Sequence, residues 1–114
     1  MHLFEAMLTS HAVTGEARFA KEASGLVELS LQKLFDSDYD CVGEFFDSDW
    51  RPDKAQRKHV EPGHGFEWVW LLHQYYKNTH DERLPPIMSR LYDRAYATGI
   101  DREYGGVFDQ IERV

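Results

Sequence analysis

The sequence is poor in cysteine, in long apolar runs and in positive charge. Cys41 is the only cysteine, which excludes an internal disulfide framework and fits a reducing compartment. No apolar stretch approaches the roughly 20 residues that span a bilayer, and residues 1–8 lack the basic start of a signal peptide. The net charge of -7 gives no basic surface for nucleic acid or anionic membranes. We therefore expect a cytoplasmic protein with no nucleic-acid and no membrane partner.

The composition that remains is that of a folded globular domain. With 114 residues the chain can form one compact domain but not two, and 42% hydrophobic with 29% charged residues argues against disorder. Aromatic residues make up 14% of the chain. They are consistent with a carbohydrate-sized, aromatic-lined pocket, although composition alone favours a role in the core.

Hydrophobic spacing predicts four helices and therefore an all-α fold. The first, near the N-terminus, ends at Gly15, and the amphipathic second covers about 16–35. The third covers about 63–79, and we expect it to be buried nearly all round because Glu67 is the only polar residue between positions 66 and 72. The fourth begins near the Pro85-Pro86 pair and ends at Gly99.

The stretches between these helices predict short strands and a loop. Residues 42–50 are aromatic-rich and interrupted by Asp47-Ser48-Asp49, which predicts a short β-hairpin with its turn there. The polar stretch 51–58 predicts an exposed loop. A second short strand is expected to begin at residues 105–108.

The sequence repeats itself in two units, about 1–62 and 63–114. The motif H-x-F-E occurs at His2–Glu5 and again at His64–Glu67, and a T-x-[DE]-x-R turn follows the first helix of each unit. A repeated unit of two helices and a loop is typical of a helical array or an α/α barrel.

The repeated histidine–glutamate pairs are the strongest candidates for chemistry. Residues at i and i+3 share a helix face, so we expect His2 to pair with Glu5 and His64 with Glu67. If the units are neighbouring hairpins, both pairs should open into the same cavity. Imidazole titrates near neutral pH and can take and return a proton within one turnover. The pattern therefore favours abstraction of a proton next to a sugar carbonyl.

Other interpretations remain open but have less support. Two His-x-x-Glu pairs resemble, in reverse order, the Glu-x-x-His pairs of di-metal helical bundles, but bridging carboxylates are missing and we expect no metal. A glycosidase could use Glu5 and Glu67 as an acid–base pair. Cys41 has no basic neighbour and is expected to be inert. The remaining histidines are interpreted as surface or packing residues; they are His11, His59, His73 and His80.

Three motifs resemble the N-acylglucosamine 2-epimerase superfamily: MHLFEA at 1–6, DWRP at 49–52 and EPGHGFEW at 61–68. The bacterial mannose isomerase and sulfoquinovose isomerase-like branch is the most similar, with cellobiose 2-epimerases further away. The resemblance implies part of an (α/α)6 barrel, here two α-hairpin repeats with a short β-hairpin insertion. It also implies cofactor-independent chemistry through a cis-enediol intermediate.

The resemblance also implies roles for individual residues. His64 would be the acid/base catalyst near C1 and C2 of the sugar, and His2 would line the same pocket and assist ring opening or substrate positioning. Glu67, and by extension Glu5, would support the site by hydrogen bonding. Two aromatic residues would shape the pocket: Phe66 and Trp68.

The chain supplies about four of the twelve helices that such a barrel contains, and a further catalytic histidine of the family has no counterpart in it. We therefore expect a fragment with little or no activity alone, which self-associates or associates with the missing part of the barrel. The alternative is a non-catalytic helical remnant or interaction module. Neither the sugar nor the choice between epimerase and isomerase follows from the sequence.

Overall fold

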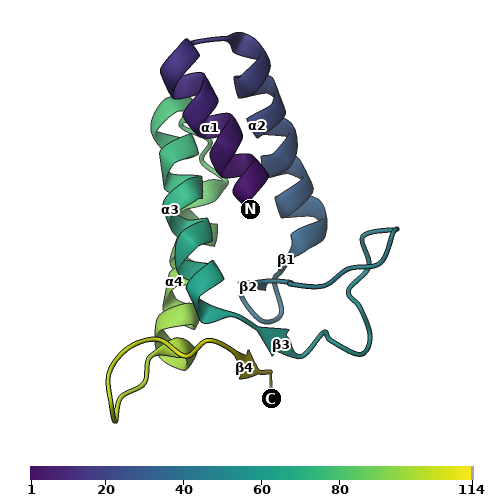
Figure 1. Cartoon of the computed structure of the whole chain (residues 1–114), viewed down its shortest axis with the longest axis vertical. Coiled ribbons are helices and arrows are strands. Elements are labelled where there is room, and N and C mark those ends of the chain that lie inside the picture. Colours follow the sequence, from purple (N-terminus) through teal and green to yellow (C-terminus); the bar gives the residue numbers. More distant parts are fainter. Residues whose placement is uncertain (114) are drawn as a thin grey trace.

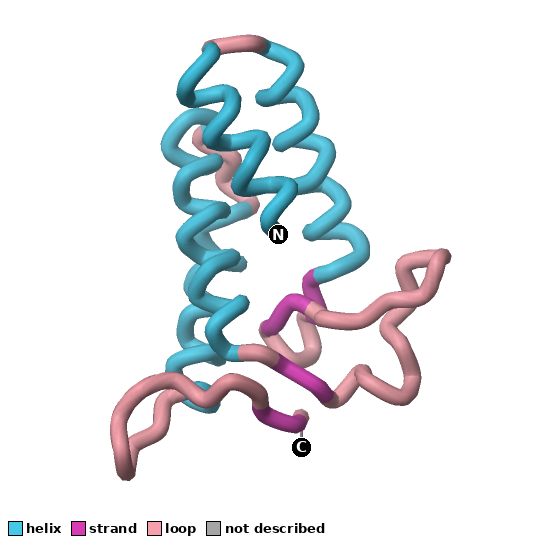
Figure 2. The backbone as a smooth tube through the Cα atoms, in the orientation of Figure 1, coloured by secondary structure: helices cyan, strands magenta, loops and turns pink. Residues whose placement is uncertain are grey.

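Four α-helices form most of the computed structural model, which describes residues 1–113. They are α1 (His2–Thr14), α2 (Ala17–Leu29), α3 (Pro62–Thr79) and α4 (Leu84–Gly99). Figure 1 shows them as two antiparallel pairs, α1 with α2 and α3 with α4, standing side by side. Short strands and loops gather at the end where α3 begins (Figure 2). The prediction of a mostly helical fold of four helices is confirmed.

Local signals explain where these helices begin and end. Gly15 has a left-handed backbone (φ 69°) and its N–H bonds to the carbonyl of His11, which closes α1. Pro62 occupies the first turn of α3, where its missing N–H costs nothing. His80 closes α3 in the same left-handed conformation (φ 51°). The predicted bounds of the third and fourth helices are within one residue of those observed.

The second helix differs from its prediction at its C-terminal end. The α-helical part stops at Leu29 and continues as a π-helical turn, η1 (Ser30–Leu34). The Ser30 hydroxyl donates a hydrogen bond to the carbonyl of Leu26, and this type of back-bond competes with regular helix geometry. Phe35, predicted to be helical, lies in a strand instead.

Two small antiparallel sheets are present, and the first forms a short β-hairpin that lies earlier in the chain than the predicted 42–50. β1 (Phe35–Asp36) pairs with β2 (Cys41–Val42), and β3 (His59–Val60) pairs with β4 (Ile111–Glu112). The predicted hairpin over 42–50 is therefore wrong in its pairing, because the buried β2 packs against α3 and α4 and pairs with β1.

Parts of the loop predictions are nevertheless correct. The turn at Asp47–Asp49 is present, closed by a single bridge between Phe46 and Pro52. The strand expected at 105–108 is reduced to a bridge between Ile100 and Val107. The intervening stretch 51–58 is a mostly exposed loop, as predicted.

The core lies between the two helix pairs. Phe4 of α1 is 1% exposed and stacks on Trp68 of α3, with ring centroids 6.0 Å apart. Burying a side chain of this size contributes about 1.5–3 kcal/mol. Buried apolar residues of α2, α3 and α4 complete this cluster: Ala23, Val27, Leu71, Leu72, Leu84 and Leu91.

One face of α3 is open, contrary to the prediction that this helix is buried nearly all round. Trp70 is 56% exposed. On the neighbouring α4, Tyr92 and Tyr96 stack on one another and are each 47% exposed. Across residues 1–113, none of the helices combines the length and the apolar character needed to cross a membrane.

Candidate functional site

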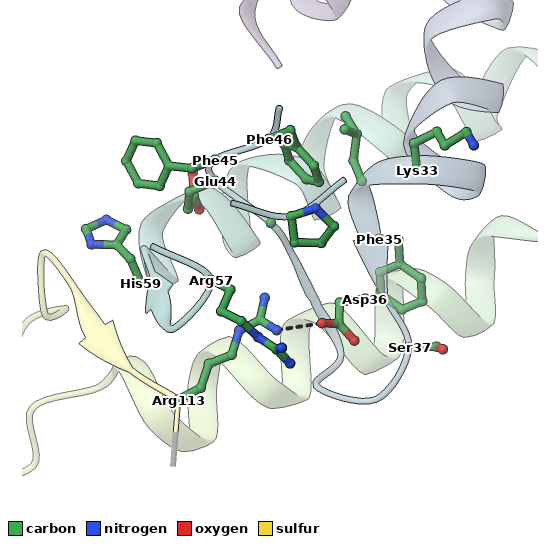
Figure 3. Close-up of a pocket in the computed structure, with 13 residues that line it drawn as sticks. Lys33, Phe35, Asp36, Ser37, Glu44, Phe45, Phe46, Arg57, His59 and Arg113 are labelled. Atoms are coloured by element: carbon green, nitrogen blue, oxygen red, sulfur yellow. Dashed lines mark hydrogen bonds and ion pairs between the residues drawn. The ribbon is translucent and has the colours of Figure 1, made fainter. Parts of the chain in front are cut away.

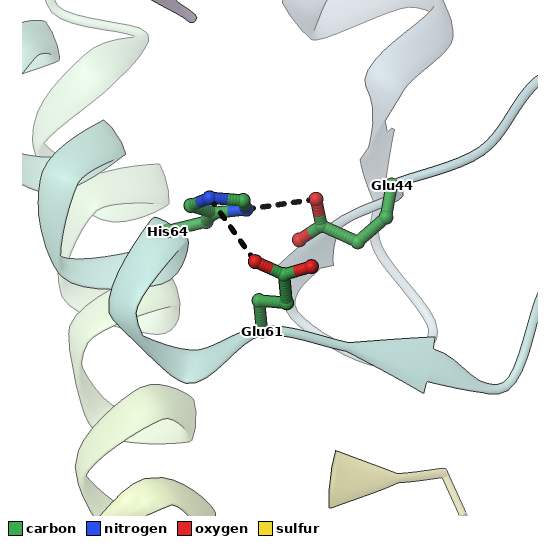
Figure 4. Close-up of side chains that lie close together, drawn as sticks. All are labelled: Glu44, Glu61 and His64. Atoms are coloured by element: carbon green, nitrogen blue, oxygen red, sulfur yellow. Dashed lines mark hydrogen bonds and ion pairs between the residues drawn. The ribbon is translucent and has the colours of Figure 1, made fainter. Parts of the chain in front are cut away.

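His64 lies in the first turn of α3, between two carboxylates (Figure 4). Its Nδ1 is 2.8 Å from Oε2 of Glu44, and its Nε2 is 3.2 Å from Oε2 of Glu61. The His64 side chain is 34% exposed and that of Glu44 only 13%. Both ring nitrogens therefore face carboxylate oxygens in a partly buried setting.

The chain brings Glu44 to His64 through the packing of β2. Val42 is buried where β2 contacts α3 and α4. The Gly43 N–H then bonds to the carbonyl of Leu34, at the end of the π-helical turn. Glu44 leaves this anchored segment directly beside α3, although it lies 20 positions from His64 in the sequence.

A fourth polar residue extends the cluster. His59 of β3 has its Nε2 2.9 Å from Oε1 of Glu61, the carboxylate that also faces His64. Glu61 thus bridges two imidazoles, and four side chains form one continuous row: His59, Glu61, His64 and Glu44.

The surroundings hold the pKa of His64 above its ordinary value. Burial by itself would lower this pKa, because it disfavours the charged imidazolium. The hydrogen bond and negative charge of Glu44, together with the charges of Glu61 and Glu67, outweigh burial and raise the pKa. The site therefore favours the protonated form of His64.

A separate cavity of about 300 Å³ lies between α1 and α3. Its lining includes His2, Glu5, Phe66 and Glu67, together with the exposed Trp70. Four of the six residues predicted from the sequence are thus brought to one cavity, but His64, which is expected from the sequence to open into it, is not among the residues that line it. His2 and Glu5 approach each other to 3.7 Å, and the His2 side chain is 82% exposed.

Two details of the predicted site are corrected by the structure. Among the described residues, His64 takes Glu44 and Glu61 as its hydrogen-bonded or ion-paired partners rather than Glu67, which acts on it only through its charge. Trp68 is 5% exposed and belongs to the core against Phe4, because it faces α1 rather than the cavity.

Sequence reasoning missed Glu44, Glu61 and His59. A signal existed for Glu61, which stands three residues before His64 and can therefore share its helix face. For Glu44 the only signal in the sequence was weak: it is a single carboxylate within the aromatic stretch 42–46. For His59 the sequence predicts only a surface or packing role.

A second pocket, of about 220 Å³, adjoins Glu44 and His59 on the side of the loops (Figure 3). Its lining carries the basic side chains Lys33, Arg57 and Arg113. Arg113 also forms an ion pair with Asp36 at the edge of this pocket.

The residues around His64 are also of the type that binds divalent cations. One ligand atom from each of Glu44, Glu61 and His64 lies within 4.8 Å of the other two. Histidine nitrogen and carboxylate oxygen suit zinc or manganese. The hydrogen bond to Glu44 (2.8 Å) and the ion-pair contact with Glu61 (3.2 Å), however, account for this spacing by direct pairing alone.

Comparison with known proteins places this arrangement in context. Residues 1–113 match the profile of the N-acylglucosamine 2-epimerase (GlcNAc 2-epimerase) family. The chain belongs to this family. The match includes both H-x-F-E motifs and the loop that carries Glu44.

Relatives of the chain include sugar isomerases and epimerases. It is 44% identical over 75 residues to a mannose-6-phosphate isomerase of Rhizobium meliloti, covering 63% of this chain and 19% of that protein. It is 29% identical over 118 residues to a D-mannose isomerase of Marinomonas mediterranea, covering 94% and 30%. It is 25% identical over 114 residues to a cellobiose 2-epimerase of Bacteroides fragilis, covering 96% and 28%.

Solved structures show the same fold. A sugar epimerase from a ruminal bacterium superposes with a TM-score of 0.83 at 16% identity, over 97% of this chain and 28% of the other. A cellobiose 2-epimerase from Spirochaeta thermophila superposes with a TM-score of 0.80 at 15% identity, over 96% of this chain and 27% of the other. The chain thus spans less than a third of the length of the relatives and structures that it matches.

Proposed function

We propose that the chain carries part of the active site of a cytoplasmic sugar 2-epimerase or aldose–ketose isomerase. The observation that carries this proposal is the position of His64, a histidine with raised pKa held by two carboxylates and one helical turn from an aromatic cavity. Family membership supports the same chemistry. The repeat units 1–62 and 63–114 would be two successive hairpins of the barrel.

In the proposed reaction the imidazole of His64 takes a proton from C2 of an open-chain aldose, next to the carbonyl. The electron pair forms the C1–C2 double bond of a cis-enediol as the carbonyl oxygen gains a proton from the solvent. Return of the proton to the opposite face of C2 gives the epimer, and its return to C1 gives the ketose. His64 would exchange protons with the sugar, and no metal or other cofactor is invoked.

The remaining cavity residues would bind the sugar. His2 would assist ring opening or positioning, and Glu5 and Glu67 would accept hydrogen bonds from hydroxyl groups. Phe66 would cover an apolar face of the ring. The core position of Trp68 gives it a supporting role, and the exposed Trp70 is the better candidate for contact with the sugar.

Incubation with mannose, N-acetylmannosamine or cellobiose in deuterated water tests the proposal. Deuterium that appears at C2, even at the low level expected of a partial barrel, should be lost in His64→Ala and kept in His73→Ala, a matched control on an exposed position of the same helix. In parallel, the histidine signals of the chain are followed by NMR during sugar titration. If no sugar gives exchange and none shifts the signal of His64, the proposal is wrong and the chain is a non-catalytic helical module.

The partial barrel supports a further expectation about assembly. The exposed Trp70, Tyr92 and Tyr96 form an apolar face on α3 and α4, and faces of this kind promote association. Self-association, or association with the rest of a barrel, would cover it. Sedimentation showing a monomer at all concentrations would refute self-association.

A further inference from the structure

The pocket of about 220 Å³ beside the loops gathers basic side chains in a chain whose net charge is -7 (Figure 3). Lys33 comes from the π-helical turn, Arg57 from the loop before β3, and Arg113 from the position after β4. The tertiary structure therefore brings together cations that are far apart in the sequence. Like charges around one small pocket repel each other, and an anion that enters the pocket relieves this repulsion.

Arg113 is held firmly at the wall of this pocket. Its side chain is only 8% exposed, and its guanidinium is paired with Asp36 through Nη1 (Figure 3). Its backbone N–H donates to the carbonyl of Lys58. The buried Nε–H, however, has no hydrogen-bond acceptor among the described residues. A buried donor without a partner is unfavourable, and an oxyanion beside Arg113 would supply the acceptor that suits a guanidinium best.

The two carboxylates that line the pocket already have partners. Asp36 pairs with Arg113, and Glu44 shares a hydrogen bond with the candidate catalytic imidazole. Within residues 1–113, Lys33 and Arg57 have no ion-pair partner. The excess positive charge of the lining therefore lies on two side chains that are free to bind an anion.

The other walls of the pocket are apolar, and its volume suits a small ligand. Phe35, Phe45, Phe46 and Pro52 line it. Charges attract one another more strongly beside apolar walls, where the local dielectric is low. The volume is below the roughly 300–1,000 Å³ of sites for drug-sized ligands, which favours a compact group. A long polyanion is disfavoured because the chain as a whole is acidic.

We infer that this pocket binds a phosphate group between Arg113, Arg57 and Lys33. Arg113 supplies the positioned donor, because Asp36 and the β3–β4 pairing hold it in place. The two exposed cations close on the phosphate oxygens from the solvent side. Guanidinium groups match these oxygens in geometry, and lysine adds a point charge. The phosphate is either free or part of a sugar phosphate, and the inference does not depend on the proposed function.

Titration of the intact chain with inorganic phosphate, at an ionic strength kept constant with sodium chloride, tests the inference by nitrogen-15 NMR. We expect a saturable shift of the Arg113 Nε–H signal, because this donor gains an acceptor. Lys33→Gln/Arg57→Gln should weaken phosphate binding at least about tenfold, the loss of one charge-assisted hydrogen bond. Both positions are exposed, so the variant should fold as the wild type does. Lys21→Gln/Arg102→Gln removes the same charge at exposed positions outside the pocket and should leave binding nearly unchanged.

The same titration with glucose 6-phosphate, and with glucose as the blank, distinguishes the two sources of the phosphate group. Tighter binding of glucose 6-phosphate than of inorganic phosphate assigns the pocket to a sugar phosphate. Equal binding assigns it to the free anion. Both results support a phosphate site.

Two results would overturn the inference. One is an Arg113 Nε–H signal that neither inorganic phosphate nor glucose 6-phosphate shifts in a saturable way, which requires no variant to fold. The other is a Lys33→Gln/Arg57→Gln protein, shown to be folded by circular dichroism, that loses no more phosphate affinity than Lys21→Gln/Arg102→Gln. Absence of C2 exchange would refute the proposed function and leave this result untouched, so the two failures are distinguishable.

Discussion

Replacing Gly99 with alanine tests the contact that fixes the start of α3. Gly99 is the last residue of α4, and a Cβ added there would lie 2.2 Å from Cβ and 2.8 Å from Cγ of Pro62. Ordinary contacts begin near 3.4 Å. Pro62 is fully buried and its rigid ring cannot rotate away, so the two helix ends must separate.

The expected cost follows from two opposing effects. Overpacking of this kind destabilises by about 1–3 kcal/mol. Alanine is the better helix former, but by no more than about 1 kcal/mol over glycine. We therefore expect Gly99→Ala to lower the free energy of unfolding by about 1–2 kcal/mol. Because His64 follows Pro62 by two residues, its hydrogen bond to Glu44 should also be disturbed.

Urea unfolding of wild type, Gly99→Ala and Gly63→Ala measures this effect. Gly63 is a matched control, since a Cβ there has no atom within 4 Å and the substitution should be neutral or slightly stabilising. A Gly99→Ala protein as stable as the Gly63→Ala protein would refute the packing argument.

Three further predictions concern stability. Phe4→Ala should lower the free energy of unfolding in urea by about 3–5 kcal/mol. Leu3→Ala is the control, at a position that is 59% exposed, and should lower it far less. Equal losses of stability would contradict the position of the core. Asp36→Asn breaks the partly buried pair with Arg113 and should cost about 1.5–3 kcal/mol at pH 7. Burial alone would raise the pKa of Asp36, but Arg113 and backbone hydrogen bonds outweigh burial and lower it. The stabilisation by the Asp36 carboxylate is therefore present above the ordinary aspartate pKa and lost as pH falls through the lowered value. If Asp36→Asn leaves the loss of stability at low pH unchanged, this argument is wrong. The raised pKa of His64 gives the opposite dependence of stability on pH. The stabilisation is complete below the ordinary histidine pKa and is lost as pH rises through the pKa of His64 in the folded protein. This loss of stability at higher pH should be absent in His64→Gln.

Much of the helical framework could be predicted, because helix ends depend on neighbours in the sequence. Gly15 permits the left-handed backbone that closes α1, and Pro62 suits the first turn of α3. The repeated H-x-F-E motif predicted that the His2–Glu5 and His64–Glu67 pairs would open into one cavity. One cavity does join His2, Glu5 and Glu67, but His64 is not among the residues that line it.

The sequence could not predict which aromatic side chains point into the core and which are exposed. Trp68 and Trp70 stand two positions apart in a run of apolar residues, so the sequence offers no contrast between them. Only the packing of α1 against α3 assigns Trp68 to the core and leaves Trp70 exposed.

The sequence by itself determined the four helices, their order and the presence of His64 at a helix start, since hydrogen bonds within a few residues govern these features. The tertiary structure alone decided the partners of His64. Glu44 reaches it because β2 packs on α3 and α4 and pairs with β1, contacts between segments that no local pattern encodes. The framework was therefore a local property of the chain, whereas the electrostatic setting of its candidate catalytic histidine arose from long-range packing.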